Sequence, residues 1–140
     1  MRYNAYMNTA DLLHLNRQYF HEAWELGDAS VIDRFVSPNV IAHGLGRPLQ
    51  GLAAFKSWYH SFRSAFSNIS CPVTHCLRDG DLTTARILFS GTHTGPSLGP
   101  KPTYKPVSFS ARCLCRWDNN LIIEGFNELN HLSLMQQLGG

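Results

Sequence analysis

Hydrophobic residues recur at helical spacing in the first half of the chain. In residues 11–26 the apolar positions lie three or four apart, which predicts an amphipathic helix. Its expected buried stripe comprises Leu12, Leu15, Tyr19, Ala23 and Leu26, widened by Leu13, Phe20 and Trp24. We expect a second, short helix over residues 31–36 and a third over residues 52–66, where aromatic residues form the stripe.

The second half of the chain changes to the alternating pattern that is typical of strands. Strands are expected over residues 71–77, 82–94, 107–117 and 121–129, after an earlier short strand at 40–43. Asp79-Gly80 and Asp118-Asn119-Asn120 have the composition of hairpin turns. Residues 132–138 are expected to add a last turn of helix. The order predicts an α+β domain, with N-terminal helices packed on a curved, mainly antiparallel sheet and a cavity between the two layers.

Composition narrows the choice of function. The chain has 140 residues, which is the size of a single domain, so we expect one domain over residues 1–140. Charged residues make up 16% of it, below the usual fraction of about 25%. The net charge is only +2 and no basic stripe is visible, which argues against nucleic-acid binding. Because we find neither a membrane-length apolar run nor a secretion signal, we expect a cytoplasmic protein with no membrane partner.

The four cysteines are expected to be reduced and buried. Cys113 and Cys115 are two residues apart in a predicted strand, so their side chains share one face and do not bond to each other. An alternative is a zinc site formed by Cys71, His75 and Cys76 together with that pair. The spacing fits no knuckle of the C-x2-4-C type, so we expect no metal.

Several short motifs occur in a distinctive order along nearly the whole chain. The sequence resembles the SnoaL-like polyketide cyclase family, whose members have the cone-shaped nuclear-transport-factor-2-like fold. The motifs that carry the resemblance are Trp24-Glu25-Leu26-Gly27-Asp28, Phe35-Val36-Ser37-Pro38-Asn39-Val40, Ile41-Ala42-His43-Gly44, Gly80-Asp81, Gly91-Thr92-His93-Thr94-Gly95, Val107-Ser108-Phe109 and Leu134-Met135-Gln136-Gln137-Leu138-Gly139.

The resemblance implies a deep pocket that holds a flat, carbonyl-bearing molecule. It also implies a homodimer formed through the sheet and an aldol-type ring closure that needs no metal or organic cofactor. In the family an aspartate on the late strands acts as the acid or base, assisted by His, Asn and Tyr side chains. The present chain departs from that pattern, because Asn127 and Asn130 stand where the family has aspartates. An amide does not ionise near neutral pH and cannot serve as the base.

Other side chains then become candidates for the chemistry. His43 ends a predicted strand where the mouth of the cavity would lie, and is the leading proton carrier. Asn127 and Tyr19 are expected to polarise a ligand oxygen. The expected ligand-binding residues are Trp58, Phe62, His93, Phe109, Cys113 and Asn130.

Three interpretations remain open on the sequence alone. The first is a cofactor-independent cyclase, isomerase or hydratase that acts on a hydrophobic carbonyl compound. The second is a non-catalytic module that binds such a molecule, which the replacement of both aspartates favours. The third is an interaction domain whose sheet makes a dimer and whose interior is filled.

Overall fold

The computed structural model describes residues 12–139. An α-helix over residues 12–19 continues into a π-helical turn, η1 (Phe20–Glu25). The short helices η2 (Ala29–Val31) and α2 (Ile32–Phe35) follow. The longer α3 (Leu52–Ser64) lies between strands, and α4 (His131–Gln137) comes last. Among these described helices, none has the length and apolar character needed to cross a membrane.

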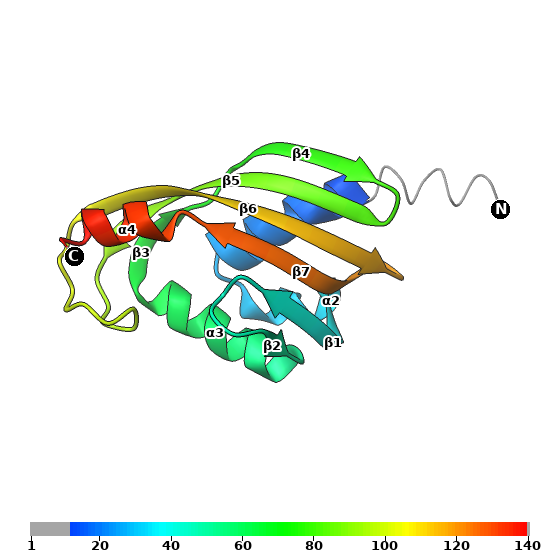
Figure 1. Cartoon of the computed structure of the whole chain (residues 1–140), viewed down its shortest axis with the longest axis horizontal. Helices are drawn as coiled ribbons and strands as arrows, with labels where there is room; N and C mark the ends of the chain where they lie inside the picture. Colours follow the sequence, from blue (N-terminus) through cyan, green and yellow to red (C-terminus); the bar gives the residue numbers. More distant parts are fainter. Residues whose placement is uncertain (1–11, 140) are drawn as a thin grey trace.

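Seven strands form one sheet, shown in Figure 1. They are β1 (Val36–His43), β2 (Leu49–Gln50), β3 (Phe66–Ser70), β4 (Val73–Asp79), β5 (Leu82–His93), β6 (Pro106–Asp118) and β7 (Leu121–Leu129). The order is β2-β1-β7-β6-β5-β3, and β4 also pairs with β5. All pairs are antiparallel except β1 with β7.

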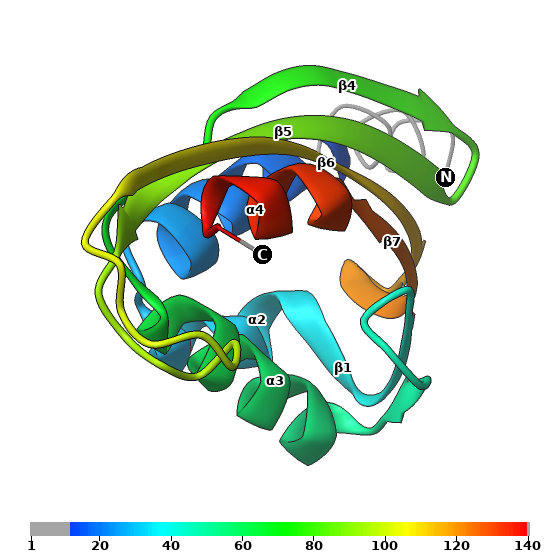
Figure 2. The ribbon, with the colours of Figure 1, turned by 60° about the vertical axis from the view of Figure 1, so that its left-hand side comes forward.

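The sheet curls around the helices, as Figure 2 shows. Strand β6 illustrates how the sequence produces the two faces, because its alternate residues from Val107 to Trp117 are buried and the residues between them are not. Side chains on the concave face pack against the helical layer, where the hydrophobic core lies. The expected α+β architecture with a curved, mainly antiparallel sheet is confirmed.

Three stretches of strand were not predicted from the sequence: β2, β3 and the first half of β1. The last two each contain an irregularity. In β3, Asn68 has a left-handed φ of 54°, and the register with β5 shifts between Ser67 and Ser70. In β1, the strand begins at Val36, the last residue of the helix expected over residues 31–36, and runs through Pro38. Its register with β7 shifts between Val36 and Ile41. Proline is tolerated at such a bulge because no ladder hydrogen bond needs its missing N–H.

The first helix extends to the expected end, but its last turn is not an α-helix. The N–H of Leu26 donates to the carbonyl oxygen of His21, five residues earlier, at 2.9 Å. This wider turn rotates the following residues around the helix axis. Tyr19, Phe20 and Ala23 are buried as predicted, whereas Leu26 is 64% exposed, so its place in the expected buried stripe was wrong.

Candidate functional site

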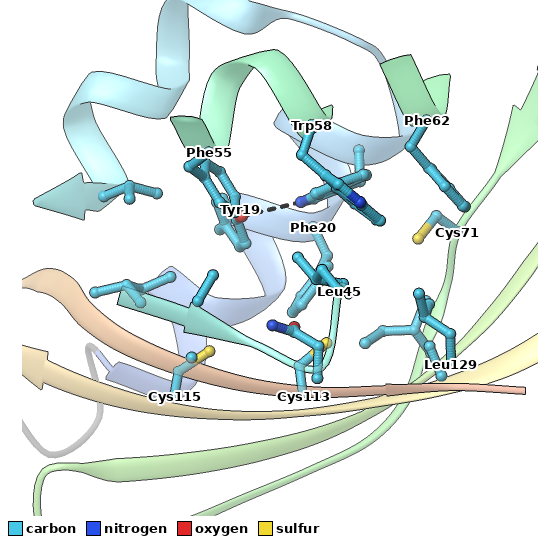
Figure 3. A pocket seen from close by; sticks show the side chains of 18 of the residues that line it. Tyr19, Phe20, Leu45, Phe55, Trp58, Phe62, Cys71, Cys113, Cys115 and Leu129 are labelled. Atoms are coloured by element: carbon cyan, nitrogen blue, oxygen red, sulfur yellow. Dashed lines mark hydrogen bonds between the residues drawn. The ribbon is translucent and has the colours of Figure 1, made fainter. Parts of the chain in front are cut away.

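A pocket lies between the helices and the concave face of the sheet. Its atom-free space is about 760 Å³, including the part that is open to solvent. Figure 3 shows the helical side, with Phe55, Trp58 and Phe62, facing the sheet side, with Cys113 and Cys115. The lining residues are Tyr19, Phe20, Trp24, Val36, Val40, Ala42, Leu45, Phe55, Trp58, Phe62, Cys71, Ile87, Phe89, Phe109, Ala111, Cys113, Cys115, Ile122, Gly125, Asn127 and Leu129.

The π-helical turn brings Tyr19 and Trp24 together on the pocket wall. In an α-helix, residues five apart point in directions that differ by about 140°. A π-helical turn closes its hydrogen bonds over five residues, so such positions come onto nearly the same side. As a result, the indole Nε1 of Trp24 donates a hydrogen bond of 3.0 Å to the hydroxyl oxygen of Tyr19.

The Tyr19 hydroxyl is a buried hydrogen-bond donor. The residue is 4% exposed, and burial raises the pKa of its phenol well above the usual value. The phenol therefore stays protonated at neutral pH. Its oxygen already accepts the Trp24 hydrogen bond, and across residues 12–139 no acceptor takes the phenol proton. That proton is available to a molecule in the pocket.

Aromatic rings supply most of the walls. Phe55, Trp58 and Phe62 repeat at helical spacing along one side of α3. The rings of Trp58 and Phe62 are stacked, with centroids 5.0 Å apart. On the sheet side, Phe89 of β5 and Phe109 of β6 lie opposite one another, with centroids 4.9 Å apart. Such surfaces favour a flat apolar guest.

Asn127 contributes the one side-chain amide among the described residues that line the pocket. Its Nδ2 donates a hydrogen bond of 3.0 Å to the backbone oxygen of His43, across the parallel β1–β7 pair. Gly44 makes this approach possible: an ideal Cβ there would lie 1.7 Å from the backbone oxygen of Asn127, and its φ is 86°. The next residue, Leu45, reaches the pocket.

Three thiols complete the lining, and they are neutral. Burial raises the pKa of both Cys71 and Cys115 to about 12. Burial also raises the pKa of Cys113 well above the usual value. All the cysteines are free, and these three act as small apolar surfaces and not as nucleophiles at neutral pH. Within the described part of the chain, no group of three or more His, Cys, Asp or Glu side chains is placed to hold a metal ion.

Comparison with known proteins identifies the family. The family model described as SnoaL-like polyketide cyclase matches residues 14–138. The chain belongs to the SnoaL-like polyketide cyclase family. A solved structure from Bacillus cereus ATCC 10987, a protein proposed to be a polyketide cyclase, is 32% identical; the match covers 91% of this chain and 80% of that one, with a TM-score of 0.75. No curated protein matches the chain significantly.

Two further structures share the fold of this SnoaL-like chain. TsrD from Streptomyces laurentii is 23% identical over 93% of this chain and 96% of its own, with a TM-score of 0.84. A SnoaL-like polyketide cyclase from Agrobacterium tumefaciens C58 is 18% identical over 91% of this chain and 98% of its own, with a TM-score of 0.76. The expected nuclear-transport-factor-2-like architecture is thereby confirmed.

The pocket of this SnoaL-like protein brings together six of the nine residues singled out from the sequence. They are Tyr19, Trp58, Phe62, Phe109, Cys113 and Asn127. The contact of Trp24 with Tyr19 was not predicted from the sequence, because α-helical spacing separates the two residues. Cys71 was not predicted as a wall residue either. The strand expected over residues 71–77 begins only at Val73, so Cys71 lies in the connection between β3 and β4.

Three expected site residues are not part of the pocket lining, which corrects the placement drawn from the sequence. His43 points to the outer face of the sheet, because its neighbour Ala42 takes the inward position. There His43 Nε2 lies 2.9 Å from Glu124 Oε2, and the His43 ring stacks on Phe126 at 4.6 Å. His93 is fully buried elsewhere, and its Nδ1 accepts from the Thr103 backbone N–H at 3.1 Å.

Asn130 has a structural role as well. Its side-chain oxygen accepts the backbone N–H of Ser133 at 3.2 Å, which caps the N-terminus of α4. Of Asn127 and Asn130, only Asn127 lines the pocket.

Proposed function

We propose that the pocket binds a small, flat, largely hydrophobic molecule whose carbonyl oxygen accepts a hydrogen bond from Tyr19. The observation that carries the proposal is the Tyr19–Trp24 hydrogen bond, which uses the phenol oxygen as acceptor and leaves its proton for a ligand. A carbonyl oxygen is the complementary group. Family membership supports a small-molecule ligand.

The chemistry of the pocket lining supports this ligand class. Ligand pockets are usually mostly apolar with a few polar groups. Here aromatic, aliphatic and thiol groups dominate the walls. Burial of a ligand's apolar surface contributes about 25 cal/mol per Å² before the costs of association. A charged ligand would find no lining counter-ion among residues 12–139.

We further propose that this protein holds its ligand without abstracting a proton from it. Proton abstraction beside a carbonyl needs a positioned base. The lining contributed by the described residues contains neither a carboxylate nor an imidazole. Residue 127, which faces the pocket, carries an amide. Glu124 and Glu128 lie an odd number of residues from it along β7 and therefore on the other face of the sheet.

Cofactor-independent isomerisation or cyclisation is the second candidate, favoured by membership of a cyclase family. In that reaction the Tyr19 phenol would stabilise an enolate oxygen, and the base would come from outside the lining described above. The two candidates differ in whether the hydrogens beside the ligand carbonyl exchange with solvent.

The experiment uses 1-tetralone, a flat bicyclic ketone, as the probe. Differential scanning fluorimetry is expected to show a concentration-dependent rise in Tm, because binding to the folded state stabilises it. Proton NMR in D₂O follows the hydrogens beside the carbonyl. We expect exchange no faster than in buffer and full recovery of the ketone. Absence of a Tm rise with 1-tetralone contradicts the binding proposal, and accelerated exchange favours catalysis.

We also propose that the chain forms a homodimer through the outer face of the sheet. Leu77, Leu114 and Phe126 are exposed and lie in one row across β4, β6 and β7, linked through Thr84 of β5. Such a row of apolar side chains suits a second copy of the same surface. Sedimentation velocity is expected to give a dimer that Leu114→Glu dissociates; a monomeric wild-type chain contradicts this.

A further inference from the structure

The connection between β5 and β6, residues 94–105, is attached to the rest of the protein at both of its ends, and Figure 2 shows it beside α3. At its start, the backbone N–H of Thr94 donates to the Ala65 carbonyl oxygen at 2.9 Å, just after α3 ends. Toward its end, the backbone N–H of Thr103 donates to Nδ1 of the His93 ring at 3.1 Å. We refer to this connection as the 94–105 loop.

The hydrogen bond from Thr103 determines where the His93 ring carries its proton. A backbone N–H can only donate, so Nδ1 is the acceptor and carries no proton. The single proton of the neutral ring is then on Nε2. This atom is buried and has no hydrogen-bond partner within residues 12–139. With the loop closed, the ring is therefore neutral and its one donor is unsatisfied, which is unfavourable.

The surroundings of His93 offer no counter-ion for a charged ring. Strand β3, whose Phe66 pairs with His93, contains no ionisable side chain, and neither do residues 106–111 of β6. A protonated ring would be an uncompensated buried charge, which is strongly unfavourable. The titratable side chains that the loop and the last turn of α3 contribute are not carboxylates; they are Lys101, Tyr104, Lys105, His60 and Arg63.

A further proton can be added to the His93 ring only at Nδ1, the atom that accepts from Thr103. Protonation would place two N–H groups against each other and remove the hydrogen bond that holds the end of the loop. The neighbouring Tyr104 makes opening easier. It is 70% exposed and has a left-handed φ of 56°, so it has little packing to lose and some backbone strain to relieve.

We propose that His93 is an acid-sensitive switch, which holds the 94–105 loop closed while its ring is neutral and releases the loop when the ring takes up a proton in mildly acidic solution. Release also affects the helical wall of the pocket. The Ser97 hydroxyl in the loop donates to the Ser61 carbonyl oxygen, so an open loop no longer supports the end of the helix that carries Phe62.

Hydrogen exchange of the Thr103 amide tests the switch, because its protection factor measures the equilibrium between closed and open loop. Between pH 7.5 and pH 5.0 the protection factor is expected to fall about thirtyfold, the ratio for one imidazole that takes up a proton only in the open loop. The Leu88 amide donates to the Pro72 oxygen, outside the loop. It is the internal reference and should keep its protection.

Two matched variants assign the effect to one histidine. His93→Asn keeps a hydrogen-bond acceptor near the position of Nδ1 but takes up no proton, so its Thr103 protection should not depend on pH. His60→Asn makes the same change at an exposed histidine of α3 and should keep the wild-type fall. A wild-type protection factor that stays constant overturns the inference, as does a fall that persists in folded His93→Asn.

A second measurement needs no variant, so it remains informative if His93→Asn does not fold. Nitrogen NMR of the wild-type ring is expected to show an unprotonated Nδ1 and a protonated Nε2 at pH 7.5. At pH 5.0, protonation of the ring should accompany the loss of Thr103 protection. A ring that is protonated at Nδ1 at pH 7.5, or that gains its proton while Thr103 stays protected, overturns the inference. No ligand is added, so these outcomes do not depend on the proposed function.

Discussion

The indole N–H of Trp24 donates to the hydroxyl oxygen of Tyr19, five residues earlier, over 3.0 Å. The π-helical turn Phe20–Glu25 makes this contact possible, because it brings residues five apart onto one side of the helix. The hydrogen bond settles the direction of the phenol proton and so determines what the pocket can recognise. Helical turns of this type are frequent at functional sites.

Filling the pocket is expected to abolish ligand binding without harming the fold. Ala111 is a buried wall residue of β6, and Ala111→Leu would place a larger apolar side chain in the cavity. We expect the Kd for 1-tetralone to rise at least about tenfold and stability to stay equal or rise by about 0.5–2 kcal/mol, as for other cavity-filling changes. Calorimetric titration and urea unfolding measure both. Ala53→Leu, on the exposed side of α3, is the matched control and should leave the Kd unchanged. Unchanged affinity in Ala111→Leu would place the ligand elsewhere.

Alanine substitutions at Gly44 and Gly46 distinguish the stability cost of backbone strain from the stability cost of close packing. Both have positive φ, 86° and 97°, which costs a non-glycine residue about 1 kcal/mol or more. Only Gly44 also lacks room, since an ideal Cβ would lie 1.7 Å from the Asn127 backbone oxygen, whereas nothing lies within 4 Å at Gly46. We therefore expect Gly44→Ala to destabilise the protein by several kcal/mol and Gly46→Ala by about 1 kcal/mol in urea unfolding. Equal losses would contradict the packing of His43–Gly44 against Asn127.

The buried thiols predict a loss of stability at high pH. Burial raises the pKa of Cys115 from its usual value of 9.0 to about 12, so the folded state keeps a proton that the unfolded state releases. The stabilisation is complete below pH 9 and is lost progressively as the pH rises toward 12. Urea unfolding from pH 8.5 to 10.5 should show a shallower decline of the free energy of unfolding for Cys115→Ala than for wild type. Parallel declines would mean that the thiol ionises freely in the folded protein.

Removing the His43 side chain is expected to leave ligand binding intact. The ring lies on the outer face of the sheet, and the atom that contacts Asn127 is the backbone oxygen, which alanine retains. The partly exposed contact with Glu124 contributes about 1 kcal/mol or less, so His43→Ala should cost little stability. A change of more than about twofold in the Kd for 1-tetralone, or loss of any turnover, would restore His43 as a pocket residue.

The sequence predicts the architecture well because the decisive patterns are local. Alternation along β5, β6 and β7 and the turn residues between them determine which face each side chain takes, and so place Phe109, Cys113 and Asn127 on the concave side. The side on which His43 lies depends instead on where β1 starts. The irregularity around Pro38 interrupts the alternating pattern, so the start of this strand could not be recognised from the sequence.

The polar chemistry of the pocket was less predictable, since it arises from contacts between elements. Neither the π-helical turn that joins Tyr19 to Trp24 nor the carbonyl that orients Asn127 leaves a signal in residue spacing. The capping role of Asn130 depends on where β7 ends and α4 begins, which spacing alone places to within a few residues.

The most direct measurement compares the affinities of 1-tetralone and its parent hydrocarbon, tetralin, in three proteins. Wild type should prefer the ketone by about three- to tenfold, because only the ketone accepts the Tyr19 hydrogen bond. Tyr19→Phe should bind both compounds equally. Tyr59→Phe makes the same chemical change at a buried phenol outside the pocket lining, which donates to the Ala23 carbonyl, and should keep the preference while losing stability. A ketone preference that survives in Tyr19→Phe would contradict the account.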